Sequence, residues 1–447
     1  MPECQHHPPS YTGLQKTANH VGEKIVTMSK ASMESLREKI VADNTTCGLE
    51  KPDLINAEMD GRYNNPLFSG DRTPSQGATQ VTMTLCEQMT SDKKILSVFT
   101  GSKLCKRAEY LRRCGVQVTC PNHTGICTAY VAEDAAIGNE EAWATIVGEE
   151  IADTLTINYL TTDGDSKTHT GMKKSHPACK NLKDPRHLVK SVKREFWKST
   201  FSADLFQKFR GLPYGTLKSR LATDVRNRCV TELERAHIVH KGNLDQIKKN
   251  MPMTIEAMIQ CYKGNCAEMC AEFSYCCQGL PDNHWSKTFL PQGIVLCLSA
   301  KDEHHFKQCV LKYLSTECLD STKLLTSTQK CESFNRVLQK TNPKMMTCYR
   351  NFPARIHTAI HLCNFGIADS TVLRLRAVGS PLVSGSRVVS RITNLRKRQL
   401  YHQQRQRNIM FKLKRGYHRI RRYRMHAKAR VPTVTYKSGV DDPKTIC

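Results

Sequence analysis

The sequence predicts an α/β protein with a mixed β-sheet, a mainly helical insertion rich in cysteine, and a basic C-terminal tail. Four short apolar stretches with the pattern of β-strands occur between residues 54 and 162. Three strands, a helix and a fourth strand follow one another in this part of the chain. A cysteine-rich segment of helical pattern then precedes one more amphipathic helix.

Composition sets the class of protein. The chain has 447 residues, enough for two or three domains and a sizeable core, and 39% of them are apolar. No run of about 18 apolar residues occurs, which excludes a membrane-spanning helix. Met1–Ser10 lack the layout of a secretory signal. We therefore expect a soluble intracellular protein whose 21 cysteines are reduced or bind metal.

The core strands are predicted from alternation and from short apolar runs. In the second strand, Val81, Met83 and Leu85 alternate with polar or smaller residues. The predicted strands are Leu54–Met59, Val81–Cys86, Ile95–Thr100 and Ile157–Thr162, with an amphipathic helix at Glu141–Leu155.

Five segments are expected along the chain. They are a helical N-terminal segment (1–50), the first part of the core (51–197), the helical cysteine-rich insertion (198–328), the rest of the core (329–370) and the basic tail (371–447).

The helix after the insertion is predicted at Gln329–Lys340. Phe334, Val337 and Leu338 share one face, while Glu332 and Asn335 point elsewhere together. Asn342-Pro343 ends this helix, and a further helix is expected at Ala354–Cys363.

Three acids are candidate metal ligands. Asp60 and Asp163 follow the first and fourth predicted strands, and Glu332 lies on the helix after the insertion. Two carboxylates on adjacent central strands of a mixed sheet are typical of the RNase H-like fold. Cleavage and transfer of DNA strands need two divalent cations roughly 3.5–4 Å apart, and these take oxygen ligands. Each acid also has a simpler interpretation when it is taken alone. Asp60-Gly61 is a common turn signal, and Asp163 with Asp165 could form a turn or a helix cap. Glu332 could be an exposed acid on a helix.

Six motifs resemble those of the Mutator-like transposase domain found in many animal genomes, and the similarity runs in order from about Gly13 to Gln403. They are Met59–Pro66, Cys120–His123 with Cys127–Ala129, Thr161–Lys167, Leu182–Leu188, Cys331–Asn335, and Thr341–Lys344 with Arg350–Phe352.

This resemblance implies an RNase H-like DNA transposase with a helical insertion before its last acid. It implies that Asp60, Asp163 and Glu332 bind catalytic Mg²⁺ or Mn²⁺. Asp184 and His187 match a family signature and are counted with the catalytic residues; His187 could transfer a proton or bind phosphate, or could pack under the sheet edge. The expected partners are transposon-end and target DNA, with further copies of the chain. The alternative is a domesticated DNA-binding or chromatin protein that no longer cleaves DNA.

Two sets of soft ligands are candidate structural zinc sites. The first is Cys105, Cys120, His123 and Cys127, in which Cys114 could replace Cys105; buried reduced thiols are the alternative. The second set lies in the insertion and comprises Cys261, Cys266, Cys270 and either Cys276 or Cys277.

The tail is predicted to bind DNA. The chain carries a formal charge of +26, and no acidic residue occurs from Ser370 to Val440. Basic residues neutralise phosphates and the interleaved aromatics stack on bases, without base-specific readout. The tail also predicts nuclear localisation. The DNA-binding candidates are Arg396, Lys397, Arg398, Arg405, Arg407, Lys412, Lys414, Arg415, Arg421, Arg422 and Arg424.

Overall fold

The computed structural model describes residues 10–64, 78–121, 127–164, 166–209, 211–265, 269–275, 295–348 and 351–429. The chain divides into two units, residues 1–364 and residues 365–447. None of the described helices is long and apolar enough to cross a membrane.

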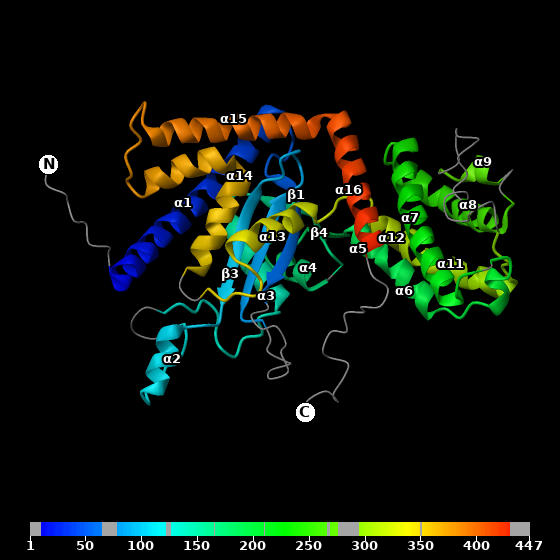
Figure 1. Ribbon diagram of the computed structural model, residues 1–447, viewed down its shortest axis with the longest axis horizontal. Coiled ribbons are helices and arrows are strands. Elements are labelled where there is room, and N and C mark those ends of the chain that lie inside the picture. Colours follow the sequence, from blue (N-terminus) through cyan, green and yellow to red (C-terminus); the bar gives the residue numbers. More distant parts are fainter. Residues whose placement is uncertain are drawn as a thin grey trace. The chain divides into compact units, whose positions relative to one another are not determined.

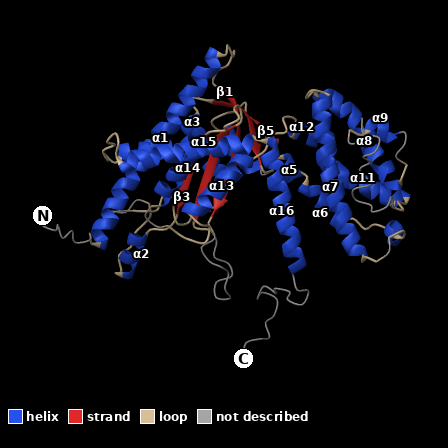
Figure 2. Ribbon diagram, turned by 45° about the horizontal axis from the view of Figure 1, so that its top comes forward, coloured by secondary structure: helices blue, strands red, loops and turns tan. Residues whose placement is uncertain are grey.

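A five-stranded mixed sheet lies at the centre of the first unit (Figures 1 and 2). Its strands are β1 (Leu54–Tyr63), β2 (Gln80–Glu87), β3 (Ile95–Ser102), β4 (Thr156–Thr162) and β5 (Lys180–Lys183). The order across the sheet is β3-β2-β1-β4-β5. The first three strands pair antiparallel, while β1, β4 and β5 are parallel. The four predicted strands are confirmed as elements.

Strand β5 was not predicted from the sequence. This strand has only four residues, Lys180–Lys183, and only Leu182 among them is buried. No apolar alternation can develop over so short a stretch, so its pairing with β4 depends on the rest of the fold.

The two faces of the sheet differ in chemistry. On one face Val81, Met83 and Leu85 of β2 pack with Trp143 and Val147 of α3 (Glu140–Ile151). The opposite face carries polar side chains and is covered by α13 (Gln329–Thr341), which packs on β1 and β2 (Figure 1). Because strand side chains alternate between faces, one strand supplies both an apolar core and a polar surface under α13.

Further helices complete the first unit around the sheet. The long helix α1 (Tyr11–Thr46) lies against the edge strand β3, where the Arg37 guanidinium donates to the Leu96 carbonyl at 2.9 Å. Shorter helices are α2 (Lys106–Arg113), α4 (Ser166–Lys173) and α5 (Pro185–Leu188).

The segment between the sheet and α13 is helical, as predicted, and has a core of its own. Phe196, Leu221, Met258 and Phe306 are among the buried residues of this core. Its helices are α6 (Lys190–Lys198), the 3₁₀ helix η1 (Ala203–Phe206), α7 (Tyr214–Val239), α8 (Leu244–Lys263), α9 (Met269–Phe273), α11 (Ala300–Leu314) and α12 (Thr316–Ser321).

The boundary between the two units falls within α14 (Phe352–Ala377), which is longer than the predicted helix. Gly366 interrupts it with φ +79° and ψ 171°, a conformation that favours glycine. In the second unit, α15 (Arg387–Arg407) and α16 (Ile409–Ala429) show that the described part of the tail is helical.

Candidate active site and cysteine cluster

Asp60 lies inside β1, not at the end of a strand and not in a turn. The strand continues to Tyr63, and Asp60 pairs with Thr84 of β2. The expectation that the first strand ends before this acid is therefore wrong. Its neighbour Gly61 also lies in β1, so the Asp-Gly pair has the extended backbone of a strand here.

Asp163 lies near enough to Asp60 for its charge to raise the pKa of Asp60. It follows directly after β4, and the parallel register pairs Glu58 with Thr161. Asp163 therefore lies at the end of the strand that runs beside the middle of β1. Asp163 is exposed, while Asp60 is half-buried. Asp165 lies outside the described residues.

Glu332 is held on α13 by three side chains. His187 Nε2 lies 3.0 Å from Glu332 Oε1, and Gln329 Nε2 and Arg336 Nη2 donate to Oε2 at 3.1 and 3.2 Å. The bond with His187 is the main reason that the pKa of Glu332 lies below its ordinary value. His187 therefore contacts the third acid and does not pack under the sheet edge.

The three acids act electrostatically on one another. Burial raises the pKa of Asp60, and the negative charges of Asp163 and Glu332 raise it further, to about 7. A carboxyl group with this pKa is only partly ionised at neutral pH. Positive charge near it would favour the ionised form, as a cation bound between the acids would supply.

Asn335 completes this polar face. Its Nδ2 donates to Asp60 Oδ2 at 2.8 Å, while its Oδ1 is buried and has no hydrogen-bond partner among the described residues. An unpaired amide oxygen beside a carboxylate is a hard oxygen donor of the kind that Mg²⁺ and Mn²⁺ take. Asp60, Asp163 and Glu332 are not among the described groups whose ligand atoms all lie within 4.8 Å of one another.

Asp184 has a different place from the one expected. It is fully buried, and its Oδ2 accepts from the backbone N–H and the hydroxyl of Thr328, both at 3.0 Å. Its Oδ1 accepts from Arg186 N at 2.7 Å. Thr328 is the N-cap of α13, so Asp184 anchors the start of the helix that carries Glu332. This geometry is that of a positioning residue.

Two charged residues of β1, neither of them predicted as a site residue, contact α13 and the residue that follows it. Glu58 Oε1 accepts from Cys331 N at 2.8 Å, and Arg62 Nη2 donates to the Asn342 carbonyl at 2.6 Å. Their alternate spacing with Asp60 in Glu58-Met59-Asp60-Gly61-Arg62 is the signal that could have indicated a shared face.

Comparison with known families decides the relationship. The Mutator-like transposase family matches residues 5–276, more than half of the chain. The chain belongs to the Mutator-like transposase family. The matched residues include Asp60, Asp163 and His187 and end before α13. A comparison with curated proteins finds no match.

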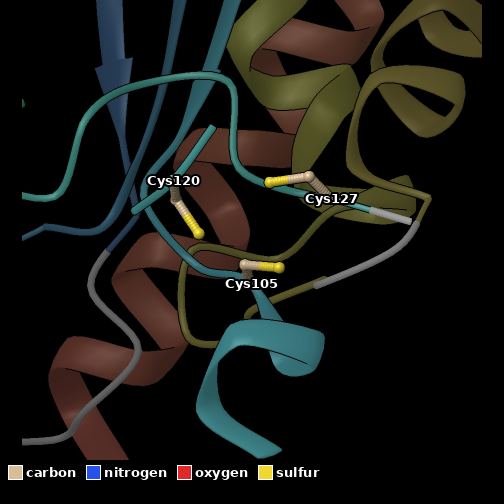
Figure 3. Close-up of side chains that lie close together, drawn as sticks. All are labelled: Cys105, Cys120 and Cys127. Carbon is tan, nitrogen blue, oxygen red and sulfur yellow. The ribbon is translucent and has the colours of Figure 1, made fainter. Parts of the chain in front are cut away.

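This Mutator-like family member also brings three of the predicted soft ligands together. The sulfur atoms of Cys105, Cys120 and Cys127 all lie within 4.8 Å of one another, and Figure 3 shows these side chains close together. His123 lies outside the described residues. Cys114, the proposed substitute for Cys105, is exposed at the other end of α2 and does not belong to the cluster.

Free thiolates are disfavoured in this cluster. Burial is the main cause that raises the pKa of Cys120 to about 12, and it also raises the pKa of Cys127. A tetrahedral zinc ion with Zn–S distances of about 2.3 Å needs its ligands at this kind of spacing.

The second cysteine set of the Mutator-like protein is described only in part. Cys261 and Cys270 are buried and share a small core with Ala257, whereas Cys266, Cys276 and Cys277 lie outside the described residues. The proposed site there remains a prediction.

The predicted DNA-binding side chains lie on α15 and α16 of the family member's second unit. Ten of the eleven are exposed, and the side chain of Arg424 lies outside the description. Arg396 pairs with Asp369 at 3.5 Å, and the Arg405 guanidinium lies over the rings of Tyr401 and Phe411.

Proposed function

We propose that the chain is a DNA transposase with an RNase H-like core, in which Asp60, Asp163 and Glu332 hold divalent metal ions for DNA cleavage and strand transfer. One observation carries the proposal. Asp60 on β1 lies near Asp163, which directly follows the neighbouring parallel strand β4, and near Glu332 of α13, so that burial together with the charges of these two acids raises the pKa of Asp60 to about 7. The strand order β3-β2-β1-β4-β5, with its antiparallel first half, supports the RNase H-like assignment.

The residues of this face fit Mg²⁺ or Mn²⁺. The three carboxylates would hold the ions, with the unpaired Oδ1 of Asn335 as a further oxygen donor. Ligands of a pair of ions need not all lie within reach of a single ion, because the two ions are about 3.5–4 Å apart. When bound, such ions activate the attacking oxygen and stabilise the leaving oxygen of the phosphodiester.

The chain's own residues orient this chemistry. His187 and Gln329 each hold one oxygen of Glu332, so the carboxylate is fixed before DNA binds. Asp163 is exposed and open to the substrate. No residue of the site is required as a covalent nucleophile: water attacks first, and the freed 3′-hydroxyl then attacks the target strand.

The substitution Asp163→Asn tests this function. Because Asp163 is exposed, the variant should fold normally and bind DNA with unchanged salt sensitivity. Its Mn²⁺- or Mg²⁺-dependent nicking of supercoiled DNA should fall by more than about 100-fold, beyond the effect of losing a residue behind a ligand. Nicking at the native rate would overturn the site. DNA binding by the native chain without any nicking would instead favour a domesticated DNA-binding protein.

The other ligands and partners of the proposed transposase follow from its surfaces. Zinc at Cys105, Cys120 and Cys127, with His123 as the fourth ligand, would join the start of α2 to two loops. The basic helices α15 and α16 would bind DNA along its backbone. We further propose that several copies assemble on DNA in the nucleus. Microscopy of a fluorescent fusion with and without the tail checks the location.

A further inference from the structure

Three alternate side chains of β1 bind along one side of α13. Glu58 Oε1 accepts from Cys331 N at 2.8 Å, and Asp60 Oδ2 accepts from Asn335 Nδ2 at 2.8 Å. Arg62 Nη2 donates to Gln339 Oε1 at 3.3 Å and to the Asn342 carbonyl at 2.6 Å. The strand and the helix therefore run in the same direction and meet at three successive levels.

The spacing of the two elements explains this match. Two residues of a strand advance by about 6.6 Å, and four residues of an α-helix advance by about 6 Å. Strand positions 58, 60 and 62 can thus contact helix positions 331, 335 and 339 without distortion. The match also sets the position of α13 along the strand, because moving the helix by one turn would break all three contacts.

The charges of the outer two residues agree with the direction of the helix. Glu58 is buried and lies at the N-terminal end of α13, where unpaired N–H groups attract negative charge. Arg62, 3% exposed, lies at the C-terminal end, where unpaired carbonyls attract positive charge. A reversed helix would place each charge against the wrong end.

Other residues keep Glu58 in place. Gln88 Nε2 and Lys93 Nζ donate to its second oxygen at 3.1 and 3.3 Å. Both carboxylate oxygens of Glu58 accept hydrogen bonds from the protein. Arg62 donates two hydrogen bonds from Nη2, while its buried Nε has no hydrogen-bond partner among the described residues.

We propose that Glu58 and Arg62 are positioning residues that fix where Glu332 lies relative to Asp60 and Asp163. Glu332 follows directly after Cys331, whose N–H binds Glu58. A shift of α13 along β1 therefore moves the third acid away from the other two. This inference rests on the proposed function, since it assigns the two residues to metal binding through Glu332.

The test measures Mn²⁺ binding by the whole chain, from the loss of the free-ion electron paramagnetic resonance signal. Arg62→Met removes the charge and both hydrogen bonds of Nη2 while keeping a similar volume, whereas Arg62→Lys keeps the charge and a nitrogen donor. We expect Arg62→Met to weaken Mn²⁺ binding at least tenfold and Arg62→Lys to stay within about threefold of the native protein, following the usual effect of residues behind a metal ligand. The matched control is Arg112→Met on α2, an exposed arginine paired with Glu133, which should bind Mn²⁺ normally.

Native Mn²⁺ affinity in Arg62→Met would overturn the inference. If that variant does not fold, as judged by circular dichroism, Glu58→Gln is used at the other end of the helix, with the same expected loss and the same contradicting result. Asp163→Asn separates the two proposals. If it abolishes Mn²⁺ binding while Arg62→Met and Glu58→Gln do not weaken it, only the positioning role fails. If Asp163→Asn leaves Mn²⁺ binding unchanged, the proposed metal site itself fails.

Discussion

Asp60 occupies an environment that opposes its own charge. The half-buried carboxyl group loses contact with water and lies near two other acids, and together these effects raise its pKa from 3.8 to about 7. A carboxyl group whose ionisation is unfavourable in the folded protein is typical of functional sites, where residues are placed for binding or catalysis and not for stability. The same residue that would bind a cation is therefore expected to weaken the metal-free fold.

Asp60→Asn should stabilise the metal-free protein at high pH. The folded protein binds the Asp60 proton more tightly than the unfolded chain does, so its stability falls as pH rises from about 4 to about 7. The neutral variant does not lose stability in this way. Its free energy of unfolding should exceed that of the native protein by an amount that grows from about pH 4 to about pH 7 and reaches at most about 4 kcal/mol. Thermal unfolding in EDTA at pH 5 and pH 8 measures it; an equal difference at both pH values would contradict the assignment.

At the scale of elements, the start of α13 is held by two buried carboxylates. Asp184 accepts from Thr328, and Glu58 accepts from Cys331. Helix N-termini bind anions through their free N–H groups. The helix thus begins where the sheet presents negative charge, which explains why a buried acid occurs in each place.

Asp184→Ala should destabilise the protein by about 1–3 kcal/mol, because the buried N–H and hydroxyl of Thr328 and the backbone N–H of Arg186 lose their acceptor. The midpoint of thermal unfolding measures this loss. Asp320→Ala is the control, since it removes an acid that is 53% exposed and forms an ion pair with Lys248. It should change stability by less than about 1 kcal/mol. Equal effects of the two substitutions would refute the anchoring role.

Zinc content tests the cysteine cluster as an element. The purified protein should lose one zinc ion per chain on Cys120→Ser. The substitution leaves only two thiols, Cys105 and Cys127, in the described cluster, and a structural zinc ion needs four ligands. Cys114→Ser should keep it, since Cys114 is exposed and lies outside the cluster. Elemental analysis gives the result, and equal zinc in both variants would exclude the site.

For the whole molecule, the uneven charge matters most. The net charge of +26 includes a stretch from Ser370 to Val440 without a single acid, while the sheet face under α13 gathers carboxylates. DNA is attracted by the first and repelled by the second unless cations are present. Tight binding and cleavage are therefore expected to depend on different parts of the chain.

Deleting residues 391–430 should flatten the salt dependence of DNA binding. If roughly six to ten phosphates are contacted, the affinity of the full chain falls by about 10³–10⁵ between 50 and 200 mM salt. Fluorescence anisotropy over this range gives the slope for both proteins. The shortened chain should keep Mn²⁺ binding at the acids, which serves as its folding control; a slope equal to that of the full chain would exclude the tail as the main DNA contact.

Local pattern was enough to predict the strands around Asp60 and Asp163, the helix carrying Glu332, and the grouping of Cys120 with Cys127. Each depends on residues close together in the chain, where alternation and short spacing act directly. The end of β1, the strand β5, the anchoring place of Asp184 and the contacts of Glu58 and Arg62 depended on folding. Glu58 meets Cys331 across 273 residues, and Arg62 meets Asn342 across 280. Such contacts arise only when the packed sheet brings α13 against β1, since no local periodicity encodes a partner so far away.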